Sequence, residues 1–202
     1  LEKAVYGLYA REDIVHPDGA TGVIYEAGEQ VATLTTDKNG QASVDGLYLG
    51  NYYVKEITPP TGYLADEEEH DLVCNYEGDF VAEVKRDCLS LEQVMKQPFE
   101  IIKAANNGKT DADLLKGAGF TAYLVSSLTV KEDGSYDFGS AKPVVIGENG
   151  ATEIFTDEKG YARSIAIPYG TYIVRETTTP HNYTPVNDFI VQITENHPTT
   201  PQ

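Results

Sequence analysis

The chain has 202 residues, which is enough for one large domain or two modest ones, each with its own hydrophobic core. Its 41% content of hydrophobic residues is typical of a folded protein and argues against intrinsic disorder. The 32 acidic and 15 basic side chains give a net charge of −17, which repels phosphate groups, so nucleic acid and anionic membrane surfaces are excluded as partners.

The first half of the sequence consists of short apolar runs separated by turns. Residues 1–6 already have the character of a strand, so we expect the chain to be an internal part of a longer protein. Residues 37–40, Asp-Lys-Asn-Gly, predict a hairpin connection in which the glycine takes a positive φ angle. Residues 50–57 alternate, which puts Tyr52, Val54 and Glu56 on one face of a strand. Residues 80–84 predict another strand, and 90–94 a short helical turn.

The second half of the sequence repeats the first. Residues 36–40 return at 156–160 and residues 50–56 return at 170–176, both at a spacing of 120. Upstream, residues 4–9 resemble 118–123 at a spacing of 114, so the second copy carries a longer loop, which we place in 126–150.

The repeat and the strand periodicity predict an all-β protein made of two tandem β-sandwich modules. Gln97-Pro98 marks the boundary, because a new strand opens at Phe99. The first module therefore covers residues 1–97 and the second covers residues 98–202.

The repeated strings resemble the Cna B-type (SpaA-like) domains of Gram-positive adhesins and pilins. Both copies carry an aromatic-rich strand that ends in glutamate and is followed by proline and tyrosine. The matching residues are Gly50, Tyr52, Val54, Glu56, Pro60, Gly62 and Tyr63 in the first module, and Gly170, Tyr172, Val174, Glu176, Pro180 and Tyr183 in the second. The resemblance covers nearly the whole chain, and it departs at His181-Asn182, where the family usually has a glycine. It implies two tandem Ig-like/prealbumin-like β-sandwich modules, and it leads us to expect that the first module lacks its first strand and the second its last.

The resemblance implies an intramolecular isopeptide bond between a lysine and an asparagine or aspartate, assisted by a buried glutamate. In the second module the matching lysine is Lys103, on the strand face of Phe99 and Ile101, and the matching proton relay is Glu176. Removal of water favours the neutral form of an amine and the protonated form of a carboxyl group, which this reaction needs. The acceptor stays unassigned, because neither Asn187 nor Asn196 occupies the family position.

In the first module the resemblance makes Glu56 the proton relay, as the counterpart of Glu176. Asp87 is the best candidate for the acceptor. The lysine would lie on a strand that precedes Leu1, since Lys3 aligns with Gly117 and not with Lys103.

Simpler interpretations apply to each of these groups. Lys103 and both glutamates could be ordinary solvated side chains. The acidic run 66–71 lacks the glycine spacing of a calcium loop and is expected to be a solvated turn. Cys74 and Cys88 are out of register for a disulfide, so free thiols are favoured. No metal-ligand spacing and no cofactor motif occurs, so we expect neither a metal nor a cofactor.

The sequence therefore predicts structural stalk or spacer modules of a cell-wall-anchored adhesin or pilin, outside the cell, and not an enzyme. The expected partners are neighbouring repeat modules of the same protein. The alternative is an adhesin module that uses the 126–150 loop or an exposed sheet face to contact a host matrix protein or glycan. An apolar or aromatic patch on that loop would favour binding, and a polar loop would favour the spacer.

Overall fold

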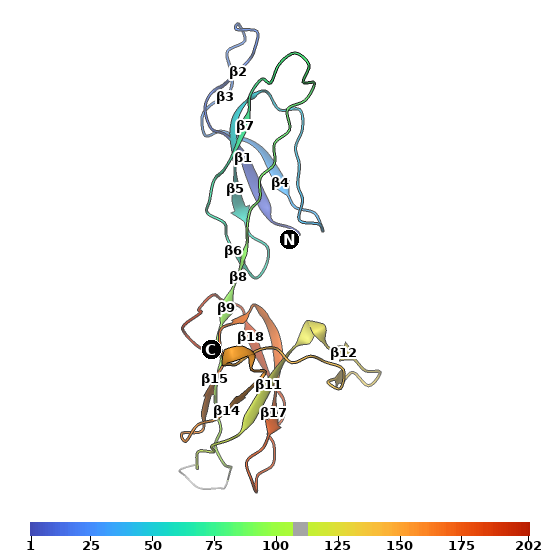
Figure 1. The fold of residues 1–202 in the computed structure, drawn as a ribbon, viewed down its shortest axis with the longest axis vertical. Coiled ribbons are helices and arrows are strands. Elements are labelled where there is room, and N and C mark those ends of the chain that lie inside the picture. The colour runs from blue at the N-terminus through green and yellow to red at the C-terminus, as the bar shows by residue number, and fades with distance from the viewer. Residues whose placement is uncertain (107–112) are drawn as a thin grey trace. The chain divides into compact units, whose positions relative to one another are not determined.

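The computed structural model describes residues 1–106 and 113–202 and is built almost entirely of β-strands (Figure 1). The chain divides into two compact units, Leu1–Gln93 and Val94–Gln202. Both helices in the described ranges are single 3₁₀ turns, and neither is long or apolar enough to cross a membrane.

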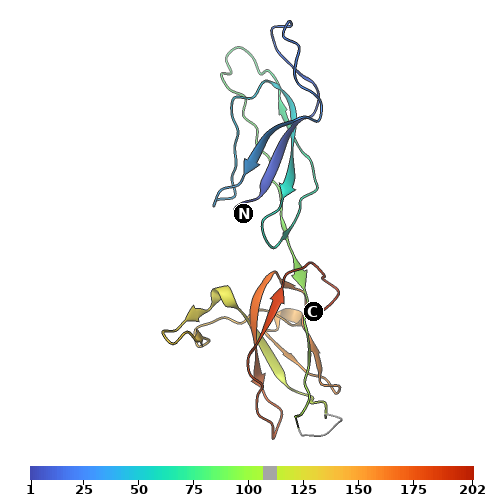
Figure 2. The ribbon, with the colours of Figure 1, turned by 180° about the vertical axis from the view of Figure 1, so that it is seen from behind.

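The first unit is organised around one four-stranded antiparallel sheet in the order β4-β1-β5-β7. The chain comes back on the other side of this sheet mostly as irregular segments (Figures 1 and 2). The strands are β1 (Val5–Ala10), β2 (Ile14–Val15), β3 (Val23–Tyr25), β4 (Gln30–Thr35), β5 (Gly50–Thr58), β6 (Tyr63–Leu64) and β7 (His70–Cys74), and β8 (Gln93–Val94) lies at the unit boundary.

The second unit has the corresponding sheet, in the order β14-β11-β17-β18, and adds further strand pairs. Strand β10 pairs with β15, and β9 pairs with β16, so this unit has strands opposite its main sheet. Its elements are β9 (Lys96–Gln97), β10 (Glu100–Ile102), β11 (Gly119–Leu124), η1 (Val125–Ser127), β12 (Thr129–Val130), β13 (Tyr136–Asp137), η2 (Glu148–Gly150), β14 (Glu153–Phe155), β15 (Tyr161–Arg163), β16 (Ile167–Pro168), β17 (Gly170–Thr178) and β18 (Phe189–Ile193).

The sequence repeat has the same local structure in both units. The carboxylate of Asp37 accepts hydrogen bonds from the backbone of residues 39 and 41, and Asp157 does the same for residues 159 and 161. Gly40 and Gly160 close these turns at φ angles of 74° and 66°, a region that glycine adopts without steric cost. The predicted turns with a positive φ at glycine are confirmed, but the hairpin prediction was wrong: β14 pairs with β11 and β15 pairs with β10, and residues 41–49 form no strand, so each turn carries the chain away from the main sheet.

Alternation along β5 and β17 builds the cores. Tyr52 is 1% exposed and Tyr172 is 2% exposed, and each hydroxyl donates to a backbone carbonyl four residues earlier. The second core is the larger one and includes Phe99 and Ile101 from the strand opposite the sheet. The expected inward face of residues 50–57 is correct: Glu56 is buried whereas Ile57 is 47% exposed.

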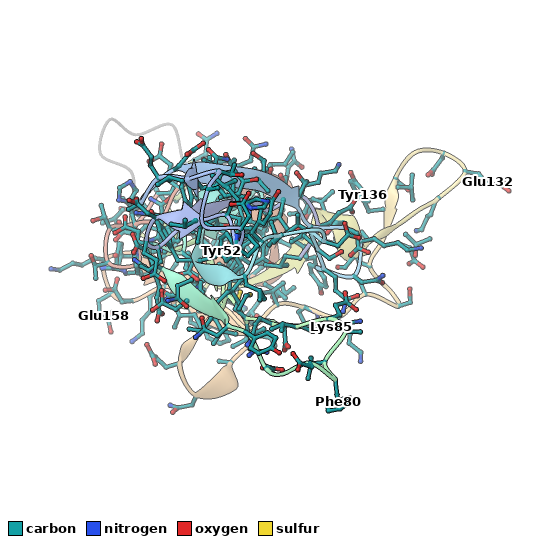
Figure 3. All side chains as sticks on the ribbon, turned by 90° about the horizontal axis from the view of Figure 1, so that it is seen from above. Tyr52, Phe80, Lys85, Glu132, Tyr136 and Glu158 are labelled. Carbon is teal, nitrogen blue, oxygen red and sulfur yellow. The ribbon has the colours of Figure 1, made fainter. Side chains whose placement is uncertain are left out.

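Two local predictions were wrong. Residues 80–84 form no strand, and the Phe80 side chain lies fully in solvent (Figure 3). Residues 90–94 form no helical turn but lead into β8. Residues 80–84 pair with no strand in the described ranges, and residues 93 and 94 pair with β6 in place of a helical turn. The thiols of Cys74 and Cys88 are free.

The additional loop of the second unit lies where the repeat spacing predicted it. It begins with η1 and forms the β12–β13 hairpin, which projects from the sheet (Figure 1). The ring of Phe138 packs edge-on against Tyr123 and lies under the guanidinium of Arg175 at 4.0 Å. Its aromatic side chain thus anchors the loop to the sheet, while Glu132 lies at the tip (Figure 3).

Candidate functional site

A lysine and a glutamate meet inside the second unit. Lys103 Nζ lies 2.6 Å from Glu176 Oε2, and the two side chains are 6% and 0% exposed. The pair joins the residue just after β10 to the carboxyl-terminal part of β17, 73 residues away in sequence. The structure therefore brings together the two residues that the sequence analysis selected, and their chemical role stays a prediction.

Strand β10 gives Lys103 its inward direction. Phe99, Ile101 and Lys103 alternate along the strand and are 1%, 8% and 5% exposed, whereas Ile102 is 71% exposed. The backbone of Lys103 is fixed on both sides, because its N–H donates to Gly160 O at 2.7 Å and its carbonyl accepts from Leu115 N at 2.9 Å. The lysine side chain thus leaves a rigid backbone and enters the core at a defined point.

Glu176 is held by the opposite sheet. It follows Tyr172 and Val174 on the inner face of β17, and its Oε2 also accepts the backbone N–H of Val186 at 2.8 Å. Its Oε1 is buried and accepts no hydrogen bond within the described ranges. A buried carboxyl oxygen without a donor is costly. Glu176 Oε1 can therefore still accept a hydrogen bond from a donor placed beside Lys103.

The arrangement can support proton transfer around an amine. A buried ion pair has lost its hydration, and conversion of amine and acid into neutral partners lowers that cost. The lysine nitrogen is a nucleophile once it is neutral, and the adjacent carboxylate can take up its proton. Whether this contact leads to an amide bond stays a prediction.

Neither nearby asparagine is hydrogen-bonded to Lys103 within the described residues. Asn196 Oδ1 accepts the backbone N–H of Lys96, and Asn187 is exposed. The chain near Gln202 runs beside β10: Gln202 N donates to Pro98 O, and Gln202 O accepts from Glu100 N, at 2.9 and 3.2 Å. One residue that bonds on both sides of Phe99 defines parallel pairing. The segment at Gln202 pairs with one edge of β10, and β15 pairs with the other edge.

Glu56 occupies the corresponding place in the first unit. It is 7% exposed, and its Oε2 accepts the backbone N–H of Asp66 at 2.6 Å, ten residues later, as Glu176 does with Val186. No lysine faces it among the described residues. Burial and the neighbouring Glu92 carboxyl raise the pKa of Glu56 to about 7, although the Asp66 N–H opposes this.

The surroundings of Glu56 form a polar network that the sequence analysis missed. The Tyr6 hydroxyl donates to Glu92 at 3.0 Å, and burial raises the pKa of Tyr6 to about 12. Asp66 accepts from Ser90 at 2.6 Å and contacts His70 at 2.8 Å. Of this network, only the position of Tyr6 could have been predicted, because the alternation of β1 turns Tyr6 inward beside Glu56. No local sequence pattern predicts that Glu92 belongs to the network.

Asp87 does not join this network. It is exposed and lines the cavity on the inner side of the sheet, and no hydrogen bond links it to Glu56 in the described part of the chain. Its role as an acceptor stays a prediction. In the acidic run 66–71, Arg11 bonds to both Glu69 and Asp71, and His70 contacts Asp66. Among residues 1–106 and 113–202, no cluster of three or more potential metal ligands occurs.

Comparisons with known proteins bear on the family and the fold of the chain. The sequence model of the family described as SpaA, prealbumin-like fold domain, matches residues 1–87 and 98–201. The TIE protein of Bacillus anthracis is 22% identical with a TM-score of 0.57, over 97% of this chain and 28% of that one. A streptococcal ancillary pilin is 23% identical with a TM-score of 0.34, over 95% of this chain and 54% of that one.

The shaft pilin SpaA of Lactobacillus rhamnosus GG is 18% identical with a TM-score of 0.34, over 97% of this chain and 82% of that one. The chain thus spans about a quarter of the TIE protein and about half of the ancillary pilin. No curated protein matches it.

Proposed function

Because this chain belongs to the family of SpaA prealbumin-like fold domains, we propose that it provides two spacer modules of a pilin or adhesin on a Gram-positive cell surface. The proposal rests above all on the buried contact between Lys103 and Glu176, at 2.6 Å. A fully desolvated ion pair in which one carboxyl oxygen has no hydrogen bond is energetically costly. The same arrangement places an amine beside a carboxyl group that can take its proton, which amide formation needs. The modules are structural and turn over no substrate.

The proposed chemistry is a single event within the protein. The neutral Lys103 nitrogen attacks the side-chain carbonyl carbon of an asparagine or aspartate on a strand next to β10. A new C–N bond forms and the C–N or C–O bond of the acceptor breaks. Glu176 carries the amine proton to the leaving group, which departs as ammonia or water. Glu56 and Asp87 have the corresponding roles in the first module.

Such a bond would suit a spacer. It would tie the first and last strands of a sandwich, so that a pull along the chain passes through covalent bonds. By analogy with disulfides, closing a loop of nearly a whole domain adds about 4 to 5 kcal/mol of stability. The partners of such modules are neighbouring modules of the same surface protein.

The loop over 126–150 favours this function over host binding. Its two aromatic side chains, Tyr136 and Phe138, contact each other and are half-buried, and Phe138 also packs against Tyr123 and Arg175 on the sheet. Its hairpin turn, Lys131–Ser135, is polar, and Asp133 is bonded within it. A host matrix protein or glycan therefore finds no aromatic patch at the tip of this loop.

Intact-mass spectrometry tests the proposal. It is performed on the 202-residue chain and on a version extended at both ends by the natural flanking sequence. Each bond is expected to lower the mass by about 17 Da for ammonia or about 18 Da for water. Tandem mass spectrometry would then show a branched peptide at Lys103.

The control is Lys103→Ala in the extended version, which must restore the unmodified mass of the second module, together with Glu176→Gln, which must slow the change. For the first module, Glu56→Gln and Asp87→Ala serve the same purpose. An extended version whose mass equals that of its sequence, in both modules, contradicts the proposed chemistry.

A further inference from the structure

The additional loop of the second unit ends in a tight turn that leads into β14. Its two central residues both have positive φ angles, 55° for Asn149 and 81° for Gly150. This is the backbone of a type I′ turn, for which Asn-Gly is a preferred pair. The backbone N–H of Ala151 closes the turn by donating to Glu148 O at 3.1 Å. The local fold thus accounts for the presence of both residues.

The base of this turn is packed into the core, whereas its tip is open. Ile146 is buried, and its N–H and that of Gly147 donate to Ala151 O at 3.0 and 2.8 Å. At the tip, Asn149 is exposed, and a Cβ atom added to Gly150 would meet nothing within 4 Å. The Asn149 side chain makes no hydrogen bond within residues 1–106 and 113–202. Its amide group can therefore rotate toward the backbone of Gly150.

An asparagine followed by a glycine can react with its own backbone. The glycine nitrogen attacks the side-chain carbonyl carbon, a C–N bond closes a succinimide ring, and the bond from that carbon to the amide nitrogen breaks. Ammonia leaves with the proton of the glycine N–H. Water then opens the ring at either carbonyl, which gives aspartate or isoaspartate. Glycine has no Cβ atom to hinder the attack, so Asn-Gly is a reactive pair.

The first unit contains the same pair, Asn39-Gly40, in a more tightly held turn. Asp37 Oδ1 accepts the backbone N–H of Asn39 at 2.8 Å, and Asp37 Oδ2 accepts its side-chain amide at 3.3 Å. The nitrogen that would attack, Gly40 N, donates to Asp37 O at 2.9 Å. At Asn149 the turn must also open, but no side-chain bond restrains the amide group. A third pair in the sequence, Asn107-Gly108, lies outside the described residues.

We propose that Asn149 is a site of spontaneous modification, at which the folded second unit converts this asparagine into isoaspartate and aspartate. Isoaspartate continues the chain through its side-chain carbon and so adds one methylene group to the backbone of the turn. The hydrogen bonds of Ile146 and Gly147 to Ala151 O then no longer fit the turn, which loosens a buried residue of the core. The reaction needs only water and goes beyond the spacer function. It is also independent of the chemistry proposed for Lys103.

The experiment incubates the 202-residue chain at about 37 °C and about pH 8 for several weeks, followed by digestion with trypsin. The peptide 132–159, whose single asparagine is Asn149, should gain about 1 Da and separate into two species. Protein isoaspartyl methyltransferase should label one of them. Asn39 should react at least about fivefold more slowly, because its hydrogen bonds to a carboxylate must break first. An unchanged peptide 132–159, or equal rates at Asn39 and Asn149, would overturn the proposal.

The matched control is the same incubation in concentrated guanidinium chloride. Unfolding removes the hydrogen bonds to Asp37, so Asn39 and Asn149 should then react at similar rates. A preference for Asn149 that persists in the unfolded chain would mean that local sequence, and not the fold, selects this site, and it would contradict the proposal.

The variant Asn149→Asp is the reference for the effect on the core, because it carries the new charge without the added methylene group. Backbone amide NMR signals of Ile146 and Ile165 should differ between the aged chain and this variant, since Ile165 N donates to Ile146 O at 2.8 Å. The signal of Tyr52, in the other unit, should be the same in both. Identical Ile146 signals in the aged chain and in Asn149→Asp would overturn the loosening of the turn.

Discussion

At the scale of single residues, the two units differ most at one repeated glutamate. Glu56 and Glu176 are each the last inward-facing residue of their strand, β5 or β17. The carboxylate of each accepts the backbone N–H of the residue ten positions later. Glu176 then meets a lysine, whereas Glu56 meets the carboxyl group of Glu92. Burial is the first cause of the raised pKa of Glu56, and repulsion from the neighbouring Glu92 carboxyl group adds to it.

The stability of the first unit should therefore depend on pH in a defined direction. The pKa of Glu56 is raised from 4.5 to about 7 by burial and by Glu92. Between these values the unfolded state loses its proton and the folded state keeps it, so stability is highest below pH 4.5 and falls as pH rises to about 7. The expected loss is about 2 to 3 kcal/mol.

Urea unfolding, followed by the amide signal of the buried Tyr52, measures this loss. Glu56→Gln removes the titrating group, so the difference between the unaltered chain and this variant should depend on pH only in that window. A difference that is constant from pH 4 to pH 8 contradicts the raised pKa of Glu56.

Gly160 is the second residue with a specific prediction. It has a φ of 66°, and a Cβ atom added to it would lie 2.4 Å from the backbone oxygen of Lys103. Gly160→Ala should therefore destabilise the second unit by about 2 to 4 kcal/mol, through backbone strain and the clash together.

The matched control is Gly134→Ala, because Gly134 has a φ of 81° and nothing within 4 Å of an added Cβ. It should cost only about 1 kcal/mol. Both are measured by urea unfolding with the amide of Tyr172 as the probe. Equal losses for the two variants would show that the contact with Lys103 has no effect.

At the scale of elements, the contact between Lys103 and Glu176 fastens β10 onto β17. Lys103→Met keeps the apolar stem but leaves Glu176 buried without its cation, which should cost about 3 to 5 kcal/mol. The double variant Lys103→Met, Glu176→Gln should recover a large part of this loss. Denaturant unfolding of the 202-residue chain gives these values.

Lys116→Met is the control for that experiment. Its pair with Glu158 is 63% and 79% exposed, so the variant should cost less than about 1 kcal/mol. A loss for Lys103→Met as small as that for Lys116→Met would mean that the buried contact contributes nothing to holding β10.

The elements also show where prediction from sequence succeeds. The faces of residues 50–57 and the turn at Asp37 follow from local rules, namely alternation and turn chemistry, and both are correct. The strand expected at 80–84 is absent, since a strand needs a partner that local sequence does not reveal. Lys103 and Glu176 could be predicted as partners, although they lie on distant strands, because the repeat and the family resemblance pointed to both residues. The network of Tyr6, Glu92 and Asp66 has no such link.

At the scale of the whole chain, the net charge of −17 lowers the stability of the folded state through repulsion between like charges. Like charges repel more in a folded chain than in an expanded one, and salt screens this repulsion. The melting temperature should therefore rise as sodium chloride increases from 10 to about 500 mM, by about 2 to 4 °C for each kcal/mol gained. Differential scanning calorimetry checks this. A decrease would show that ion pairs such as Arg11 with Asp71 outweigh the repulsion.

The parallel pairing of Gln202 with Pro98 and Glu100 has a mechanical consequence. When two adjacent parallel strands are drawn apart by opposite ends, they slide along each other, and the hydrogen bonds between them are strained together. In a hairpin peeled open from one end, they would break one after another. Breaking the bonds together in shear needs a larger force than breaking them one by one. The parallel direction of this segment would therefore help the unit to resist tension even without a covalent link.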